Sequence, residues 1–199
     1  MLSRDDWRGS LTRAAAAHDL GGRVLALAQF VELFARWNQR INLSAAKTPL
    51  EIAGHVVDSL AVVPHLREAA SVVDVGTGGG FPALIAAIAL PELAIRCVEP
   101  VNKKTAFLST AVRELRLTRV EVMTRRVDEA LDHGFDVAMS RATFDLAEWL
   151  TLGAPLVRPG GKVLGMEGLE QVELGPDDTR HAYDAGDRQR AIIVRRVPA

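Results

Sequence analysis

One acid and four closely spaced glycines are the residues of this chain best suited to bind a nucleotide-like ligand. Asp74 stands in an apolar, β-branched stretch, and Gly76, Gly78, Gly79 and Gly80 follow it. Glycine adopts positive φ and lets a ligand approach the backbone closely. A buried strand that ends in such a turn is where α/β proteins bind adenosine-type ligands. A turn that only reverses the chain needs fewer glycines, so the ligand interpretation is favoured.

The residues after the glycines argue against two phosphate-binding patterns. In a dinucleotide fingerprint counted from Gly76, the third glycine would stand at position 81, which is Phe81. A phosphate loop counted in the same way needs glycine and lysine where the chain has Phe81 and Pro82. The remaining pattern is Asp-x-Gly-x-Gly-x-Gly followed by a bulky residue. It is similar to the first motif of class I S-adenosylmethionine-dependent methyltransferases.

A second acid, Glu99, supports a cofactor site. It ends the largely apolar segment 94–98, about twenty residues beyond the glycine loop. An acid at the end of the second strand of a βαβ unit can accept hydrogen bonds from both ribose hydroxyls. Glu99 could instead be an ordinary solvated strand end. Its occurrence together with the glycine loop favours the cofactor interpretation.

The methyl acceptor is restricted by residue types that the sequence lacks. Methylation of exocyclic amines commonly uses an Asn/Asp-Pro-Pro-aromatic loop, and residues 140–143 read Ser-Arg-Ala-Thr instead. Methylation at carbon needs a cysteine nucleophile, but Cys97 is the only cysteine and is expected to be buried in a strand. Guanine N7 carries a lone pair and no proton, so transfer to it needs alignment but no general base. The sequence therefore fits N7 as the acceptor.

The composition predicts one globular domain over residues 1–199, because the chain is 48% hydrophobic and 25% charged. The acidic start lacks a signal-peptide core and the alanine run 14–17 is too short to span a bilayer, so we expect a cytoplasmic protein without membrane association. One cysteine and five histidines without ligand spacing indicate neither a disulfide nor a metal site. We also expect a monomer.

Strands and helices alternate beyond the glycine loop, which predicts an α/β fold with a Rossmann-like, doubly wound, mostly parallel sheet. Residues 1–70 are expected to form an N-terminal helical cap and residues 71–199 the cofactor-binding core. The apolar residues of the cap with helical spacing are Phe30, Leu33, Phe34 and Trp37, then Ile52, Val56, Leu60 and Val63. The expected strands are 72–75, 94–99, 120–124, 135–140, 162–166 and a late strand over 191–197, and the expected helices of the core are 82–90, 102–115, 127–131 and 145–156.

Five segments of the chain resemble one particular family of class I methyltransferases. They occur in the same order and spacing in the ribosomal RNA small subunit methyltransferase G family, also called the glucose-inhibited division protein B family. The segments are 37–44 (Trp-Asn-Gln-Arg-Ile-Asn-Leu-Ser), 55–60 (His-Val-Val-Asp-Ser-Leu), 74–82, 103–108 and 135–142. The resemblance implies S-adenosylmethionine-dependent methylation of guanine N7 in 16S ribosomal RNA, with naked RNA or the 30S particle as the partner.

The resemblance also implies a set of cofactor-binding residues. Gly76 and Phe81 match residues that contact the methionine and adenosyl parts, and Arg141 matches an arginine near cofactor and substrate that positions them without acting as a base. The full set is Asp74, Gly76, Gly78, Gly80, Phe81, Glu99, Pro100 and Val101 at the loop and ribose, Val127 and Asp128 beside the adenine, and Arg141. Each of the last three has an alternative: Val127 as core, Asp128 as a helix cap and Arg141 as a surface ion-pair partner.

The expected RNA contacts combine aromatic and basic side chains. Because guanine N7 faces a groove that side chains cannot enter in A-form RNA, the target must lie in a loop or a distorted helix. The candidate residues are Arg36, Trp37, Arg40, His55, Lys103 and Lys104. Trp37 could instead belong to the core and the two lysines to a solvated helix face. The net charge of −1 argues against a strongly basic RNA binder.

Three positions depart from the family pattern. Ala83 replaces a glycine, and Lys104 stands where arginine is common. Glu167 replaces the lysine of a Lys-Gly pair and reverses a charge near the expected substrate face. The alternatives are therefore a class I methyltransferase with another RNA, a protein or a small molecule as acceptor, or a cofactor-binding relative that has lost activity.

Overall fold

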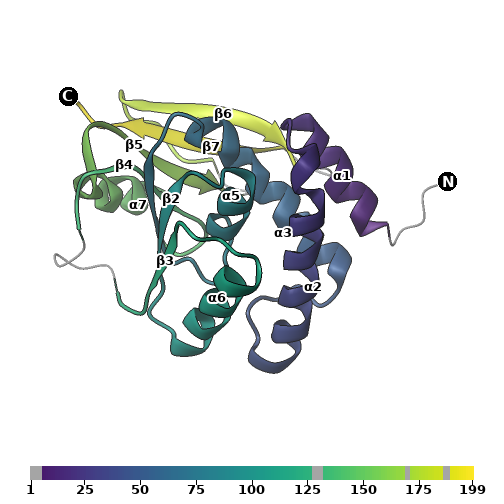
Figure 1. The fold of residues 1–199 in the computed structure, drawn as a ribbon. Helices are drawn as coiled ribbons and strands as arrows, with labels where there is room; N and C mark the ends of the chain where they lie inside the picture. The colour runs from purple at the N-terminus through teal and green to yellow at the C-terminus, as the bar shows by residue number, and fades with distance from the viewer. Residues whose placement is uncertain (1–5, 127–131, 169–170, 186–188) are drawn as a thin grey trace.

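The computed structural model describes residues 6–126, 132–168, 171–185 and 189–199. Within these residues, seven strands form one sheet in the order β3-β2-β1-β4-β5-β7-β6 (Figure 1). The strands are β1 (Ser71–Val75), β2 (Ala94–Val98), β3 (Val120–Met123), β4 (Phe135–Ser140), β5 (Val157–Glu167), β6 (Asp178–Asp184) and β7 (Gln189–Arg196). The first five pair in parallel, and β7 pairs antiparallel with both β5 and β6. The expected mostly parallel α/β sheet is confirmed.

Helices cover both faces of the sheet. The cap consists of α1 (Trp7–Ala17), α2 (Val24–Ile41), α3 (Pro49–Ser59) and α4 (Val63–Leu66), and the core helices are α5 (Ala83–Ala89), α6 (Asn102–Glu114) and α7 (Leu146–Gly153). The cap, α5 and α6 share one apolar cluster with Val72 of β1, whereas α7 packs with Val73 on the opposite face. Successive strand residues point to opposite faces, so this alternation is what a doubly wound sheet requires.

The helical cap is joined to the glycine loop through aromatic rings. Phe30 and Phe34 lie one turn apart on α2, and their ring centroids are 5.3 and 5.1 Å from that of Phe81. α3 begins with a capping box formed by Thr48 and Glu51, which fixes where that helix starts. The cap therefore supports the residue that follows the glycines.

Several element boundaries differ from the sequence-based expectation. β5 begins at Val157 rather than at 162, because the backbone on both sides of the Pro-Gly-Gly turn pairs with β4: Val157 aligns with Phe135, and Lys162 with Val137. α7 ends at Gly153 and a 3₁₀ turn continues to Leu156. The expected late strand is β7, but the strand before it, β6, was not predicted. The helix expected near 127–131 lies outside the described residues.

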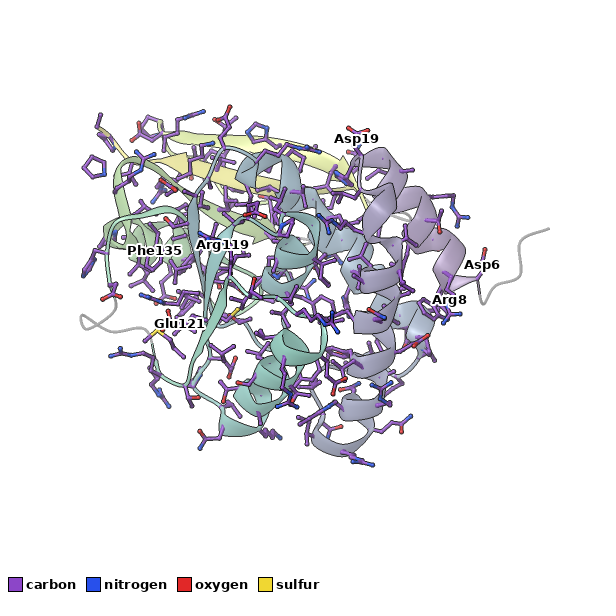
Figure 2. The ribbon with its side chains drawn as sticks, viewed as in Figure 1. Asp6, Arg8, Asp19, Arg119, Glu121 and Phe135 are labelled. Carbon is purple, nitrogen blue, oxygen red and sulfur yellow. The ribbon has the colours of Figure 1, made fainter. Side chains whose placement is uncertain are left out.

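The two outer strands carry charged residues, Glu121 on β3 and Asp178, Arg180 and Asp184 on β6. Glu121 of β3 accepts a hydrogen bond from Arg96 of β2 at 2.8 Å, and Figure 2 shows Arg119 and Glu121 beside this edge. Charged side chains are common on edge strands because they discourage pairing with a further strand. In the part of the chain that the structure describes, no helix is both long and apolar enough to cross a membrane.

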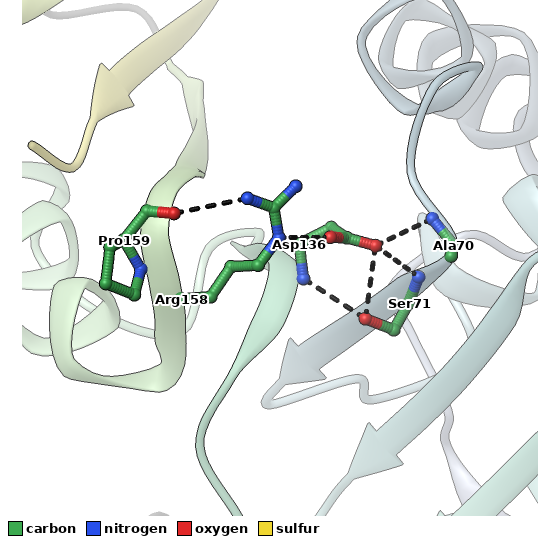
Figure 3. A network of polar contacts seen from close by, with 5 residues as sticks. All are labelled: Ala70, Ser71, Asp136, Arg158 and Pro159. Carbon is green, nitrogen blue, oxygen red and sulfur yellow. Dashed lines mark hydrogen bonds and ion pairs between the residues drawn. The ribbon is translucent and has the colours of Figure 1, made fainter. Parts of the chain in front are cut away.

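At the amino end of the parallel strands, Asp136 connects three strands (Figure 3). Its Oδ2 accepts hydrogen bonds from the backbone N–H groups of Ala70 at 2.7 Å and Ser71 at 2.9 Å. Its Oδ1 accepts from Nε of Arg158 at 2.6 Å. Burial opposes ionisation, but the hydrogen bonds from Arg158, Ala70 and Ser71 outweigh it and lower the pKa of Asp136. This end of the sheet is held by a carboxylate with several partners.

Candidate active site

The glycine loop folds over the carboxyl ends of β1 and β2. The N–H of Gly76 donates to the carbonyl of Val98 at 2.8 Å, and φ is positive at Gly76, Gly78 and Gly80. A Cβ atom at Gly76 would lie 2.3 Å from Oγ1 of Thr143, so no side chain fits there. A cavity of about 170 Å³ lies against this loop. Its walls are Leu43, Ser44, Gly76, Thr77, Gly78, Gly79, Phe81, Lys104, Arg141, Ala142 and Thr143.

Asn38 holds the segment that forms the outer wall of this loop cavity. Its side chain donates to the carbonyl of Ala46 at 2.5 Å and accepts from the N–H of Ser44 at 2.9 Å. Asn42 ends α2 in the left-handed conformation, and Leu43 and Ser44 then line the cavity. The Trp-Asn…Asn-Leu segment of the sequence thus has a physical role, which is to place these two residues beside the glycines.

Asp74 lies in β1 beneath the loop and is 1% exposed. Neither carboxylate oxygen has a hydrogen-bond partner among the described residues. Burial raises the pKa of Asp74 to about 7. Buried polar atoms nearly always have partners, so this carboxylate suits a ligand that brings a donor or a positive charge. An orphaned acid beside glycines with no room for a side chain fits a cofactor such as S-adenosylmethionine.

Glu99 is buried at the end of β2 and braces the loop. Its Oε2 accepts from the N–H of Gly78 at 2.9 Å, and its Oε1 accepts from the N–H of Val101 at 3.0 Å. An ionised carboxylate has about four acceptor positions, so Glu99 keeps capacity for further donors. Pro100 and Val101 are exposed beside it. The structure therefore brings these three predicted residues to the loop, whereas Val127 and Asp128 lie outside the described residues.

Arg141 follows β4 and is mostly buried. Its Nη1 donates to Oδ2 of Asp58 at 3.2 Å, and its guanidinium lies 5.1 Å from the ring centroid of Phe81. The ring of His55, on α3, also packs against Phe81, with the two ring centroids 5.6 Å apart. Burial lowers the pKa of Arg141, and the carboxylates of Asp58 and Asp74 oppose this change. The predicted alternative of an exposed ion pair is wrong, because this pair is largely buried.

A larger cavity of about 630 Å³ lies on the other side of Arg141. Arg141 and Ala142 line both cavities, so the two are neighbours. The walls of the larger one are His55, Ser140, Arg141, Ala142, Phe144, Asp145, Leu146, Trp149, Met166, Glu167, Gly168, Val172 and Arg190. Burial, followed by the charge of Arg141, lowers the pKa of His55. We call this larger space the acceptor cavity.

Asp58 organises the cationic wall of the acceptor cavity, and the sequence interpretation gave it no role. It is 6% exposed and accepts from Arg141 and Arg190 on Oδ2 and from the hydroxyl of Tyr183 on Oδ1 at 2.7 Å. In the sequence, Asp58 belongs to the His-x-x-Asp-Ser segment, and that segment could have indicated its importance. Tyr183 and Arg190 had no signal, because β6 was not predicted and neither residue belongs to a quoted segment.

Glu167 is not an open negative charge facing the acceptor cavity. The guanidinium of Arg180 donates to both of its oxygens, at 2.9 and 2.8 Å, and the N–H of Val172 donates to Oε1 at 2.9 Å. The hydrogen bonds from Arg180 lower the pKa of Glu167 although burial opposes this. The residue that departs from the family pattern is therefore ionised and paired with a strand that the sequence did not reveal.

The remaining RNA candidates lie on α2, α3 and α6. Trp37 is partly buried and packs edge-on against Phe107 at 5.8 Å, so it contributes to the core as its alternative interpretation held. Arg36 is exposed and lies 3.7 Å from Glu114 of α6. Arg40 and Lys103 are exposed, and Nζ of Lys104 lies 3.9 Å from Glu99 at the loop cavity. Of the six candidates, His55 alone lines the acceptor cavity.

Two other sequence-based expectations concern the chemistry of side chains. Cys97 is buried in β2 as expected, and burial raises the pKa of its thiol, so it is no nucleophile. Among the described residues, no cluster of three or more His, Cys, Asp or Glu side chains could hold a metal ion.

The strand order, the antiparallel last strands and the glycine loop define the class I methyltransferase fold. Solved structures agree in fold. A methyltransferase from Geobacter sulfurreducens matches with a TM-score of 0.62 at 14% identity, covering 84% of this chain and 90% of that one. An O-methyltransferase from Streptomyces achromogenes, solved in complex with SAM, matches with a TM-score of 0.59 at 16% identity, covering 85% and 90%.

Sequence relatives are much closer. The model of the family described as rRNA small subunit methyltransferase G matches residues 23–186. Ribosomal RNA small subunit methyltransferases G from Burkholderia mallei and Burkholderia pseudomallei are each 40% identical over 184 residues, covering 87% of this chain and 77% of theirs. The chain belongs to the rRNA small subunit methyltransferase G family. S-adenosylmethionine-dependent methylation of ribosomal RNA, the activity expected from the sequence, is thereby confirmed at the level of the family.

Proposed function

We propose that this protein methylates N7 of a guanine in 16S ribosomal RNA, either in naked RNA or in the 30S particle. The family supports ribosomal RNA as the substrate, and the atom and the RNA species are our proposal. We further expect it to act as a monomer in the cytoplasm and without a metal ion.

The glycine loop and the strand ends beneath it supply the groups that would hold the cofactor. S-adenosylmethionine, when bound, supplies an electrophilic methyl group on a positively charged sulfur. Asp74 offers an unpartnered carboxylate to positive charge, and the glycines allow close approach of the backbone. Glu99, with Pro100 and Val101, offers acceptors to the ribose. Val127 and Asp128 remain the predicted adenine contacts.

The observation that carries the proposal is the place of Arg141, which forms the wall shared by the two cavities. A guanidinium donates hydrogen bonds and cannot act as a base. Guanine presents two acceptors on one edge, O6 and N7. A hydrogen bond from Arg141 to O6 would orient this edge and leave N7 free. Because N7 carries no proton, the chain needs only to align the base, which a fixed guanidinium can do.

The acceptor cavity also offers a surface for a flat base. Phe144 is half-buried, lines the cavity and stacks on Trp149, with the ring centroids 5.7 Å apart and the planes 16° apart. Trp149 is only 1% exposed and backs this ring, so Phe144 is the ring that a base can reach. Trp149 is locked by its indole N–H, which donates to the carbonyl of Leu164 at 2.8 Å. Single-stranded RNA bases commonly stack on aromatic side chains. This surface favours a guanine that is turned out of a loop.

Transfer of tritium from labelled S-adenosylmethionine to naked 16S RNA and to 30S particles tests the proposal. Nucleosides from the labelled RNA are then separated, and the modified base is mapped. We expect label in 7-methylguanosine at one position in at least one of the two substrates. Label in a different nucleoside, or no label in either substrate although the protein binds the cofactor, would contradict the proposal.

Because Arg180 neutralises Glu167, the charge reversal at position 167 is no longer a reason to expect another acceptor.

A further inference from the structure

We infer that Arg190 binds a phosphate of the RNA chain at the mouth of the acceptor cavity. It would supply there the positive charge that Glu167 removes from the position of the family lysine. The inference rests on the proposed function, because it concerns how the same cavity holds its substrate.

Arg190 is placed to reach a ligand. It stands near the start of β7, lines the acceptor cavity and donates from Nη1 to Oδ2 of Asp58 at 3.1 Å. Its side chain is 33% exposed, whereas that of Arg141 is 18% exposed. A guanidinium carries five N–H donors, so the bond to Asp58 leaves others for an anion. Arg190 is therefore the outer member of the pair of arginines, and Arg141 is the inner one.

The charges around the cavity leave this pair incompletely neutralised. Arg141 and Arg190 share the single carboxylate of Asp58, whose other oxygen is occupied by the neutral hydroxyl of Tyr183. Glu167 is matched by Arg180 in a bidentate pair and does not compensate them.

The other acid of the cavity is already committed. Asp145 caps α7, where it accepts from the N–H groups of Ala147 at 3.0 Å and Glu148 at 3.1 Å, and the positive end of the helix offsets its charge. Asp74 lies near Arg141, and Asp58 is shared by both arginines, so Arg190 is the guanidinium of the pair whose charge is less offset and can meet a ligand.

A phosphodiester is the anion that fits this arrangement. The planar fork of arginine matches two phosphate oxygens, and phosphate contacts fix the register of a nucleic acid. A cavity of about 630 Å³ has room for a nucleotide beside the aromatic surface. The family lysine and Arg190 come from different strands, β5 and β7, so a cation lost at position 167 is regained from the neighbouring strand.

Arg190→Gln tests the inference, with Arg190→Lys to retain the charge and Arg13→Gln as a control that removes the same charge from exposed α1. Binding of naked 16S RNA and of 30S particles is measured over a series of salt concentrations, together with KM and kcat for methyl transfer and the affinity for S-adenosylmethionine. For Arg190→Gln we expect the slope of log K against log salt to fall in magnitude by about 0.7 to 1 and KM to rise about tenfold. Cofactor affinity should stay within about twofold, and Arg190→Lys should restore the slope.

An unchanged salt slope in Arg190→Gln would overturn the inference, and so would the same loss in Arg13→Gln. Loss of cofactor affinity with an unchanged slope would show that Arg190 only balances Asp58, which also overturns it. The two proposals fail separately. If the wild type shows the Arg190-dependent slope but forms no 7-methylguanosine, the acceptor assignment fails and the phosphate contact stands.

Discussion

Two aspartates at opposite ends of the parallel strands show how differently the two edges of this sheet are built. Asp74, at the carboxyl end of β1, has no partner for either oxygen among the described residues, and burial raises its pKa to about 7. Asp136, at the amino end of β4, accepts from two backbone N–H groups and from Arg158, and its pKa is lowered. The amino end is complete as it stands. The carboxyl end contains a buried carboxylate that none of the described residues satisfies.

The same contrast holds for two pairs of arginine and aspartate. Arg158 and Asp136 connect strands at the amino end, and neither residue lines the loop cavity or the acceptor cavity. Arg141 and Asp58 stand between two cavities at the carboxyl end. We therefore expect substitutions at the amino end to change stability and substitutions at the carboxyl end to change cofactor binding or methyl transfer.

The largest effect is expected for Arg141→Met. Removing a preorganised donor that aligns the acceptor should lower methyl transfer at least about 100-fold, because such donors typically contribute 10²–10³ in rate. The matched variant is Arg158→Met at the amino end, which should leave methyl transfer within about twofold. Initial rates of tritium transfer to 30S particles measure both. Equal losses of methyl transfer in the two variants would contradict the functional distinction between the carboxyl and amino ends of the sheet.

Asp136→Ala should cost stability without changing cofactor binding. It leaves the N–H groups of Ala70 and Ser71 and the Arg158 side chain without their acceptor, and we expect the free energy of unfolding to fall by about 2 to 3 kcal/mol. Urea denaturation measures this change, and calorimetry with S-adenosylmethionine provides the second readout. A destabilisation under about 0.5 kcal/mol is the usual effect of a surface substitution. Such a small value would mean that this hydrogen-bond network does not stabilise the fold.

Asp74→Asn should have the opposite pattern. It removes no hydrogen bond seen in the structure and relieves the cost of burying a charge, so unfolding at pH 7 should be unchanged or slightly harder. The affinity for S-adenosylmethionine should fall about tenfold or more, because a charged partner is lost. The same calorimetric and denaturation experiments decide this. Unchanged affinity would mean that the orphaned carboxylate is not part of the cofactor site.

Stability should also respond to pH with opposite signs at the two aspartates. Because the pKa of Asp74 is raised, the folded state binds its proton more tightly, and this contribution to stability is lost as pH rises from about 4 to about 7. Because the pKa of Asp136 is lowered, its contribution is present above about 4 and is lost as pH falls through its folded-state pKa.

The difference in stability between Asp74→Asn and the wild type, followed over pH, isolates the contribution of Asp74. Denaturation of Asp74→Asn and the wild type at several pH values should show the variant gaining relative stability by at least about 1 kcal/mol between pH 5 and 7, since one pKa unit corresponds to about 1.4 kcal/mol. Parallel pH profiles for the two proteins would refute the raised pKa of Asp74.

The sequence predicted the cofactor half of the site better than the acceptor half. Asp74, the glycines and Glu99 are near one another in sequence or stand at the ends of adjacent parallel strands. Hydrophobic periodicity and glycine spacing are enough to place them. The acceptor cavity depends on Asp58, Tyr183 and Arg190, which meet only through the packing of α3 against the last two strands.

β6 is the reason that much of this second half could not be predicted. Its residues are all half-buried or exposed and include charges at Asp178, Arg180 and Asp184, so the segment lacks the apolar signal of a strand. Pairing with β7 forms it instead. The partner of Glu167 could not be found for the same reason, since Arg180 lies on this strand.

Hydrogen exchange with and without S-adenosylmethionine tests most directly whether the carboxyl end of the sheet is the end built for a ligand. We predict that the cofactor slows exchange in the glycine loop, residues 76–81, and in residues 99–101 and 141–143. We predict no change at the amino end, in residues 70–71 and 157–161. Protection at the amino end, or no added protection in the glycine loop at saturating cofactor, would contradict this account.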